Sequence, residues 1–131
     1  MAAVKRQENK HVKVELLSLV HSSAAHSADL HAQHVFAYRL RITNESQGYV
    51  VLNARKWILE YPDGEQDVYE GDKIVGKVVA LEPEESFEYG SFHLVERNCD
   101  VSGSYHGYSQ TEDYIWVRIP KFHLHIPDKI A

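Results

Sequence analysis

Two glycines flank a lysine at Gly71, Lys73 and Gly76, and this is the first group whose types and spacing could do chemistry. Glycines placed before a helix can bring backbone N–H groups and the helix N-terminus onto a phosphate. A dinucleotide fingerprint needs three glycines, in the pattern G-x-G-x-x-G, and Lys73 stands where the second glycine belongs. Residues 78–83 give no helix start, and the surroundings are acidic. We therefore expect no nucleotide cofactor, and these residues disfavour a nucleotide-binding or dinucleoside polyphosphate-related enzyme.

Histidines and acids raise a second possibility, a metal site. Four of the nine histidines, His21, His26, His31 and His34, fall close together, and His123 and His125 share one strand face. Imidazoles are common ligands of transition metals, but no cysteine or carboxylate accompanies either set at ligand spacing. The run Asp63-x-Glu65-x-Asp67 lacks the following glycine and the distant glutamate of a calcium loop, so a hairpin turn explains it better. We expect no bound metal and keep divalent-cation binding or sensing as an alternative function.

Catalytic groups are the third possibility. No serine lies in Gly-x-Ser-x-Gly, and Cys99 has no histidine or asparagine close by at the spacing of a cysteine nucleophile. Glu84 and Glu85 are adjacent, so their side chains point apart and do not form an acid–base pair. We expect no catalytic residue, and hence a protein that is not an enzyme.

Composition sets the class of protein. The chain has 131 residues, of which 44% are hydrophobic and 25% are charged, which is ordinary for one globular domain. No apolar run approaches the roughly 20 residues of a membrane-spanning helix. The polar N-terminus gives no secretory signal, and one cysteine permits no intrachain disulfide, so we expect a cytoplasmic protein without a membrane partner. Residues 60–88 carry ten acids and two lysines, a local charge of −8, which argues against nucleic acid as a partner.

The elements that position these groups are strands, because no stretch keeps a period of 3.6 residues. The expected strands cover residues 11–22, 34–44, 49–61, 66–70, 78–81, 86–95, 101–109 and 114–119, with 123–126 as a final piece. Short strands separated by turns predict an all-β sandwich or small barrel, and Trp57 within a long strand favours the sandwich. We expect tails at residues 1–10 and 128–131. The expected core comprises Phe36, Tyr38, Leu40, Ile42, Trp57, Phe87, Tyr89, Tyr105, Ile119 and Phe122.

Five segments of the chain form a recognisable pattern: Arg55-Lys56-Trp57-Ile58, Gly71-x-x-Ile74-Val75-Gly76, Leu81-x-Pro83-x-x-x-Phe87-x-Tyr89-x-Ser91, Gly103-x-Tyr105 and Ile119-Pro120-x-Phe122-x-Leu124. Together they resemble the ApaG family, across residues 11–127. The resemblance implies an immunoglobulin-like or fibronectin type III-like β-sandwich of about seven to nine antiparallel strands. The family occurs as a small stand-alone bacterial protein, the type that this chain resembles, and fused in F-box proteins and a polymerase-delta-interacting protein. The resemblance therefore implies a protein-interaction module, in a family linked with cobalt resistance and magnesium efflux but without an accepted activity.

Residues 71–91 differ from the family pattern at the points that bear on function. Where the family has a Pro-Gly turn this chain has Pro83-Glu84, so we expect a negative φ at Glu84. The segment is expected to connect the two sheets and to meet an unknown protein partner through its charge. The protein itself is expected to be a monomer or homodimer. The expected partner-binding residues are Gly71, Asp72, Lys73, Gly76, Glu82, Glu84 and Glu85.

Overall fold

The computed structural model describes residues 6–23 and 33–127, and every regular element in them is a β-strand. No helix in this part of the chain is long and apolar enough to cross a membrane. The nine strands are β1 (Gln7–Glu8), β2 (Val12–Ser23), β3 (His34–Asn44), β4 (Val50–Glu60), β5 (Gln66–Asp72), β6 (Val79–Leu81), β7 (Ser86–Val95), β8 (Cys99–Ser109) and β9 (Tyr114–Leu124).

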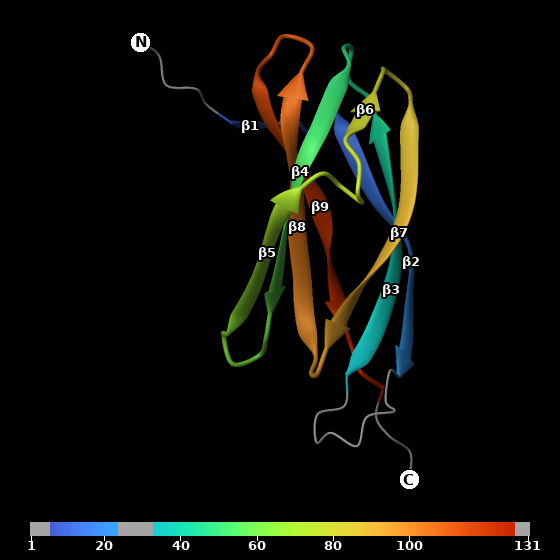
Figure 1. Cartoon of the computed structure of the whole chain (residues 1–131), viewed down its shortest axis with the longest axis vertical. Coiled ribbons are helices and arrows are strands. Elements are labelled where there is room, and N and C mark those ends of the chain that lie inside the picture. Colours follow the sequence, from blue (N-terminus) through green and yellow to red (C-terminus); the bar gives the residue numbers. More distant parts are fainter. Residues whose placement is uncertain (1–5, 24–32, 128–131) are drawn as a thin grey trace.

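The strands form two sheets that face each other (Figure 1). The larger sheet has the order β1-β9-β8-β4-β5, with β6 also pairing with β4, and the smaller sheet has the order β2-β3-β7. Two facing sheets, antiparallel except for the pairing of β1 with β9, give the immunoglobulin-like arrangement of a sandwich. The prediction of an all-β sandwich is therefore confirmed.

The N-terminal segment differs from the expectation. We expected a tail over residues 1–10, but Gln7 and Glu8 form β1, which pairs with β9 in parallel. The backbone N–H of Asn9 donates to the carbonyl of Trp116, and Glu8 forms an ion pair with Arg118. Two strand residues are too few to produce an alternating pattern, so hydrophobic periodicity gives no signal for this strand.

The core forms where the inward faces of the two sheets meet. Along β3 the side chains of Phe36, Tyr38, Leu40 and Ile42 point inward and are buried, as period-two alternation requires. Trp57 of β4 reaches across the sandwich, and its ring centroid lies 5.4 Å from that of Tyr38. The other predicted core residues are also buried, except for Phe87, which is half-buried with the Lys77 ammonium over its ring.

Two glycines of β8 permit its close approach to β4. The register between these strands shifts between Leu52 and Ala54, which brings the Val51 carbonyl toward Gly107. A Cβ atom at Gly107 would lie 1.7 Å from that carbonyl oxygen, and one at Gly103 would lie 2.7 Å from the carbonyl oxygen of Lys56. Any side chain at Gly107 would therefore force the two strands apart.

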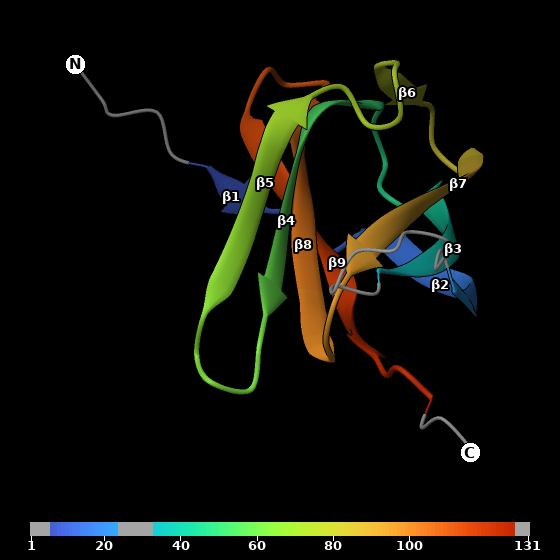
Figure 2. The same cartoon turned by 60° about the horizontal axis from the view of Figure 1, so that its bottom comes forward.

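The segment of residues 71–91 crosses from one sheet to the other. It leaves the larger sheet at the end of β5, adds β6 to β4, turns at residues 82–85 and enters the smaller sheet as β7. This is the inter-sheet connection that the sequence indicates. Figure 2 shows the path running past the ends of the strands.

The 82–85 turn corrects one expectation. Glu84 has a φ of +73°, whereas we expected a negative value. The buried Asn44 holds this geometry: its backbone N–H donates to the Glu85 carbonyl, and its carbonyl accepts from the Glu84 N–H. Its side-chain amide donates to the carbonyls of Gly48 and Leu81. These contacts fix the backbone whatever residue stands at 84, so Glu84 occupies a conformation that glycine adopts more easily.

We expect Glu84→Gly to raise the free energy of unfolding by about 0.5–1 kcal/mol. A left-handed conformation costs a non-glycine residue roughly 1–2 kcal/mol, and the greater freedom of glycine in the unfolded chain offsets part of the gain. Urea denaturation followed by tryptophan fluorescence measures the change. Glu85→Gly is the matched control and should be destabilising, because Glu85 lacks a positive φ and its carboxylate accepts from the Glu82 N–H. A loss of stability in both variants would contradict the prediction.

Candidate binding site

The predicted partner-binding residues fall into two separate structures. The first, which we call the 71–78 loop, begins with the last two residues of β5, Gly71 and Asp72, and contacts β4, where the Lys73 N–H donates to the Asn53 carbonyl. The second is the 82–85 turn, which contacts β3 through Asn44. The structure therefore does not gather these residues into one acidic surface. β6 separates the two parts, and each is fixed by its own hydrogen bonds.

Arg55 holds the start of the 71–78 loop. Its Nη1 atom donates to the carbonyls of Asp72, at 2.6 Å, and of Lys73, at 3.1 Å. Gly71 leaves room for this guanidinium, since a Cβ atom at that position would lie 2.9 Å from Arg55 Nη2. These contacts keep Lys73 at a φ of +68°, an uncommon conformation for a lysine. Gly71 thus makes space for the Arg55 guanidinium and does not form part of a phosphate-binding loop.

The rest of the loop is closed by its own backbone. The Ile74 N–H donates to the Lys77 carbonyl, and the Ile74 side chain is buried in the core. Gly76 takes a φ of +77°. Val75 and Val78, which flank Gly76 and Lys77 in the chain, remain exposed. The loop therefore has a defined shape and presents two apolar side chains to solvent.

A groove opens between the larger and smaller sheets beside this loop. We call it the side groove; its volume is about 360 Å³ and its walls come from β3, β4, β5 and β7. Arg55 lies in its wall, so one residue contacts both the groove and the 71–78 loop. Tyr69, Phe92 and Leu94 are about half exposed along it. The lining includes Tyr38, Arg55, Trp57, Tyr69, Phe92 and His93.

His93 is a half-buried histidine in the groove wall. Its ring centroid lies 4.9 Å from those of Tyr38 and Trp57, and its Nε2 atom is buried without a hydrogen-bond partner among the described residues. Burial disfavours the charged imidazolium and lowers the pKa of His93 to about 4. His93 therefore packs as an aromatic ring at neutral pH.

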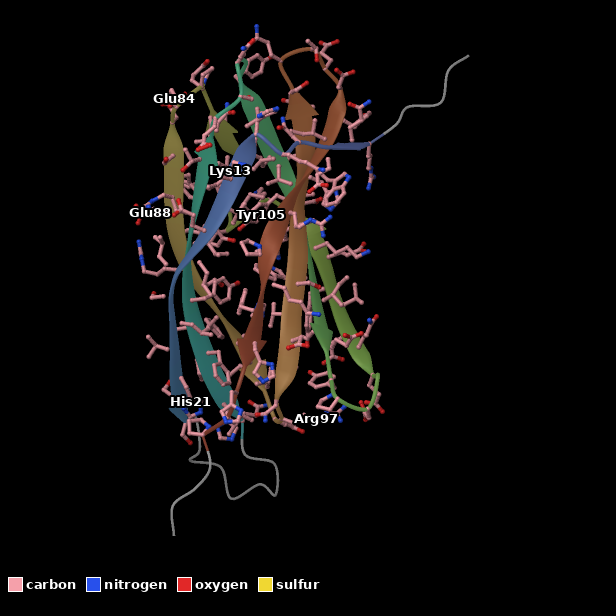
Figure 3. The ribbon with its side chains drawn as sticks, turned by 180° about the vertical axis from the view of Figure 1, so that it is seen from behind. Lys13, His21, Glu84, Glu88, Arg97 and Tyr105 are labelled. Carbon is pink, nitrogen blue, oxygen red and sulfur yellow. The ribbon has the colours of Figure 1, made fainter. Side chains whose placement is uncertain are left out.

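At the opposite end of the sandwich from Glu84, Arg97 joins the connection between β7 and β8 to the turn of the β4–β5 hairpin (Figure 3). Its guanidinium lies 2.9 Å from carboxylate oxygens of both Asp63 and Glu65, and 4.2 Å from the centre of the Tyr61 ring. The hydrogen bond from Arg97 lowers the pKa of Asp63. Asp67 accepts instead from the Tyr61 hydroxyl. The acids that resemble a calcium loop thus bind side chains of this protein.

The remaining candidates do not assemble into a catalytic or metal site. No group of three or more histidines, cysteines or acids lies in metal-binding geometry among residues 6–23 and 33–127. His21 and His34 contact each other, His123 contacts Asp100, and His26 and His31 fall outside the described residues. Cys99 is buried, and burial raises its pKa to about 11, so its thiol is not activated as a nucleophile.

Sequence reasoning missed Arg55 and Arg97. Arg55 did carry a signal, because it stands two residues before the buried Trp57 and so on the inward face of β4. A cation among inward positions needs an acceptor, and the ends of neighbouring loops supply backbone carbonyls. Arg97 gave no comparable signal, because its partners lie more than 30 residues away.

These features define an immunoglobulin-like sandwich domain with a fixed inter-sheet loop beside an open groove. The family model of the ApaG domain, DUF525, matches residues 24–110. The chain is 35% identical to Protein ApaG of Nitrosomonas eutropha over 96 residues, which cover 72% of this chain and 76% of the relative. It is 32% identical to Protein ApaG of Bradyrhizobium diazoefficiens over 103 residues, 78% of each chain. The chain belongs to the ApaG family.

Solved structures show the same fold. The crystal structure of the putative ApaA protein of Bordetella pertussis aligns with a TM-score of 0.71 at 25% identity, covering 95% of this chain and all of that one. An X-ray structure of a structural genomics target aligns with a TM-score of 0.77 at 20% identity, covering 92% of this chain and 90% of that one. The names of these proteins state no reaction or ligand.

We expect Arg55→Ala to lower the free energy of unfolding by about 1–2 kcal/mol, because two hydrogen bonds from a charged donor are lost. Amide exchange at Lys73 and Ile74 should also become faster, since the loop loses its support. Lys56→Ala is the matched control: Lys56 is the next residue, and its exposed ion pair with Glu70 contributes less than about 1 kcal/mol. Hydrogen exchange measured by NMR tests both variants. Equal exchange at these two amides in wild type and Arg55→Ala would contradict the role assigned to Arg55.

We expect the protein to lose stability as the pH falls from about 6.5 to 4. The folded state keeps His93 neutral, with a pKa of about 4, whereas an unfolded chain protonates it near 6.5. The unfolded state therefore binds more protons in this window, which costs roughly 2–3 kcal/mol. Urea denaturation at pH 7, 5.5 and 4.5 measures the slope. His93→Phe should flatten it but not abolish it, because burial also lowers the pKa of His106. Identical slopes in the two proteins would disprove the assignment.

Proposed function

We propose that this protein is a non-enzymatic binding domain that recognises a partner protein through the 71–78 loop and the 82–85 turn. The observation that carries the proposal is the preformed shape of the loop. Arg55, Asn53 and the buried Ile74 hold it in place, with Lys73 in a left-handed conformation. Uncommon backbone conformations persist only where surrounding contacts impose them, and they concentrate at functional sites.

The exposed chemistry of this region also supports protein recognition. Val75 and Val78 offer apolar contacts on the 71–78 loop, and Glu82, Glu84 and Glu85 are exposed on the separate 82–85 turn. A fixed loop loses little conformational entropy on binding, so its contacts yield affinity efficiently. The carboxylates accelerate the approach of a basic partner and align it. The absence of an activated nucleophile among the described candidates is consistent with binding as the whole activity.

Two further predictions accompany this proposal. The single buried cysteine supports a cytoplasmic location. A partner that acts in cobalt or magnesium homeostasis agrees with the family resemblance drawn from the sequence.

Affinity capture from a lysate of the source organism tests the proposal. Tagged wild-type protein is compared with the triple variant Glu82→Gln/Glu84→Gln/Glu85→Gln, at low and at moderate salt. We expect at least one protein to be enriched by wild type and reduced roughly tenfold by the variant, since three charge contacts at up to 0.5 kcal/mol each give about that factor.

The control variant Glu15→Gln/Glu96→Gln/Glu112→Gln removes the same number of charges elsewhere. It should retain the partner, and direct binding of the purified partner should show the same order of affinities. Capture that is equal for all three proteins, or that recovers nothing at either salt concentration, would refute the proposal.

A further inference from the structure

The inference concerns β5, the edge strand next to the side groove. All seven of its residues pair with β4, from Gln66 opposite Glu60 to Asp72 opposite Ala54. No strand of the described residues pairs with its other edge. The backbone groups along that edge are therefore available to an added strand. β5 also lacks proline and lysine, the residues that most often block such an edge.

Side chains alternate along β5 between two environments. Tyr69 lies opposite the buried Trp57 and so points toward the inner side, where it lines the side groove. Glu70 lies opposite Lys56 on the outer face, and Val68 lies opposite Ile58 on that same face. A strand added to β5 would place every second side chain at the groove and the others on the outer face.

The groove side of such a strand would meet aromatic and aliphatic surface. Tyr69 is exposed there, at 52%, around a floor that includes Trp57, Tyr38 and His93. Phe92 and Leu94, exposed at 57% and 47%, border the groove on β7, but alternation turns their side chains to the outer face of the smaller sheet. Exposed apolar side chains beside an open edge favour an apolar residue at each inward position of the partner.

The acids of β5 determine which side chains suit the outer-face positions of an added strand. β5 carries Glu70 and Asp72 on its outer face and no basic residue, whereas Asp67 lies opposite the buried Leu59 and so on the inner face with Tyr69. Glu70 pairs with Lys56, but no cation among the described residues pairs with the carboxylates of Asp67 or Asp72. A second copy of this chain would bring another set of these acids to the same edge, so self-pairing is disfavoured. Lysine or arginine side chains complement the edge.

We propose that β5 is a docking edge for an extended segment of a partner protein in which apolar residues, facing the side groove, alternate with lysine or arginine. This rests on the proposed function and specifies the chemistry of the partner. Figure 2 shows β5 at the edge of the larger sheet, the position from which an added strand extends it. The backbone of that strand supplies the ladder, and its apolar side chains enter the side groove beside Tyr69.

The test uses the full-length protein and the seven-residue peptide Lys-Val-Lys-Phe-Lys-Val-Lys, acetylated and amidated at its ends, which matches the seven residues of β5. NMR titration at low salt should give saturable shifts concentrated at the amides of residues 66–72 and at the groove residues Phe92 and His93. The edge strand β2 is the internal reference, and its amides should not shift.

Two control peptides separate the contributions of charge and of backbone hydrogen bonds: glutamates replace the lysines in one, and alternate backbone amides are N-methylated in the other. Both should bind at least roughly tenfold more weakly, through lost charge pairs and a lost ladder respectively.

Protein variants complete the design. Asp67→Asn/Glu70→Gln/Asp72→Asn should weaken binding of the lysine peptide about tenfold, whereas Glu15→Gln/Glu96→Gln/Glu112→Gln should leave it unchanged. Urea denaturation verifies that both variants fold. Shifts spread equally over the β2 and β5 edges, no saturable binding, or equal binding of the N-methylated peptide would overturn the docking edge. If the peptide fails while capture still depends on Glu82, Glu84 and Glu85, the docking edge is wrong and the proposed function stands.

Discussion

The buried amide of Asn44 is the constraint on which the connecting loops depend. It is the one polar side chain among the described residues that lies fully inside the core, and an unpaired amide there would be costly. Its side-chain amide donates to the carbonyls of Gly48, in the β3–β4 turn, and of Leu81, at the end of β6, and its oxygen accepts from the N–H and hydroxyl of Ser46. Satisfying the amide therefore fixes the β3–β4 turn and the end of β6 together, and its own backbone holds the 82–85 turn. One residue links the two sheets at the end of the sandwich where Glu84 lies.

Arg55 has a similar effect on the other part of the inter-sheet connection, by a different route. It stands on the inward face of β4, yet its charge reaches the edge of the core and ends on two loop carbonyls. Asn44 and Arg55 are 11 positions apart and act on opposite ends of the segment between β5 and β7. The connection is thus held by polar side chains beneath it as well as by the burial of Ile74, Val79 and Leu81.

Most of the fold follows from local patterns in the sequence, whereas the loop geometry does not. Alternation along β3 places Phe36, Tyr38, Leu40 and Ile42 on one face without reference to the rest of the chain. The bounds expected for β7, residues 86–95, agree with the structure for the same reason. The φ of Glu84 was predicted wrongly because it depends on Asn44, which is 40 positions earlier. The hydrophobic pattern of a single sequence gives no information about hydrogen bonds between residues so far apart in the chain. The short β1 escaped prediction because two residues show no periodicity.

The high solvent exposure of β5 affects which part of the molecule unfolds locally. Six of its seven residues are exposed, so peeling this strand from β4 exposes little apolar surface beyond what water already reaches. The ladder to β4 and the contact of Arg97 with Asp63 and Glu65 oppose that motion. β8 differs, because its centre is buried around Tyr105 and it cannot leave without dissolving the core. β5 is therefore a separate, weakly cooperative unit of local unfolding, and the global transition belongs to the strands around β8, including β4.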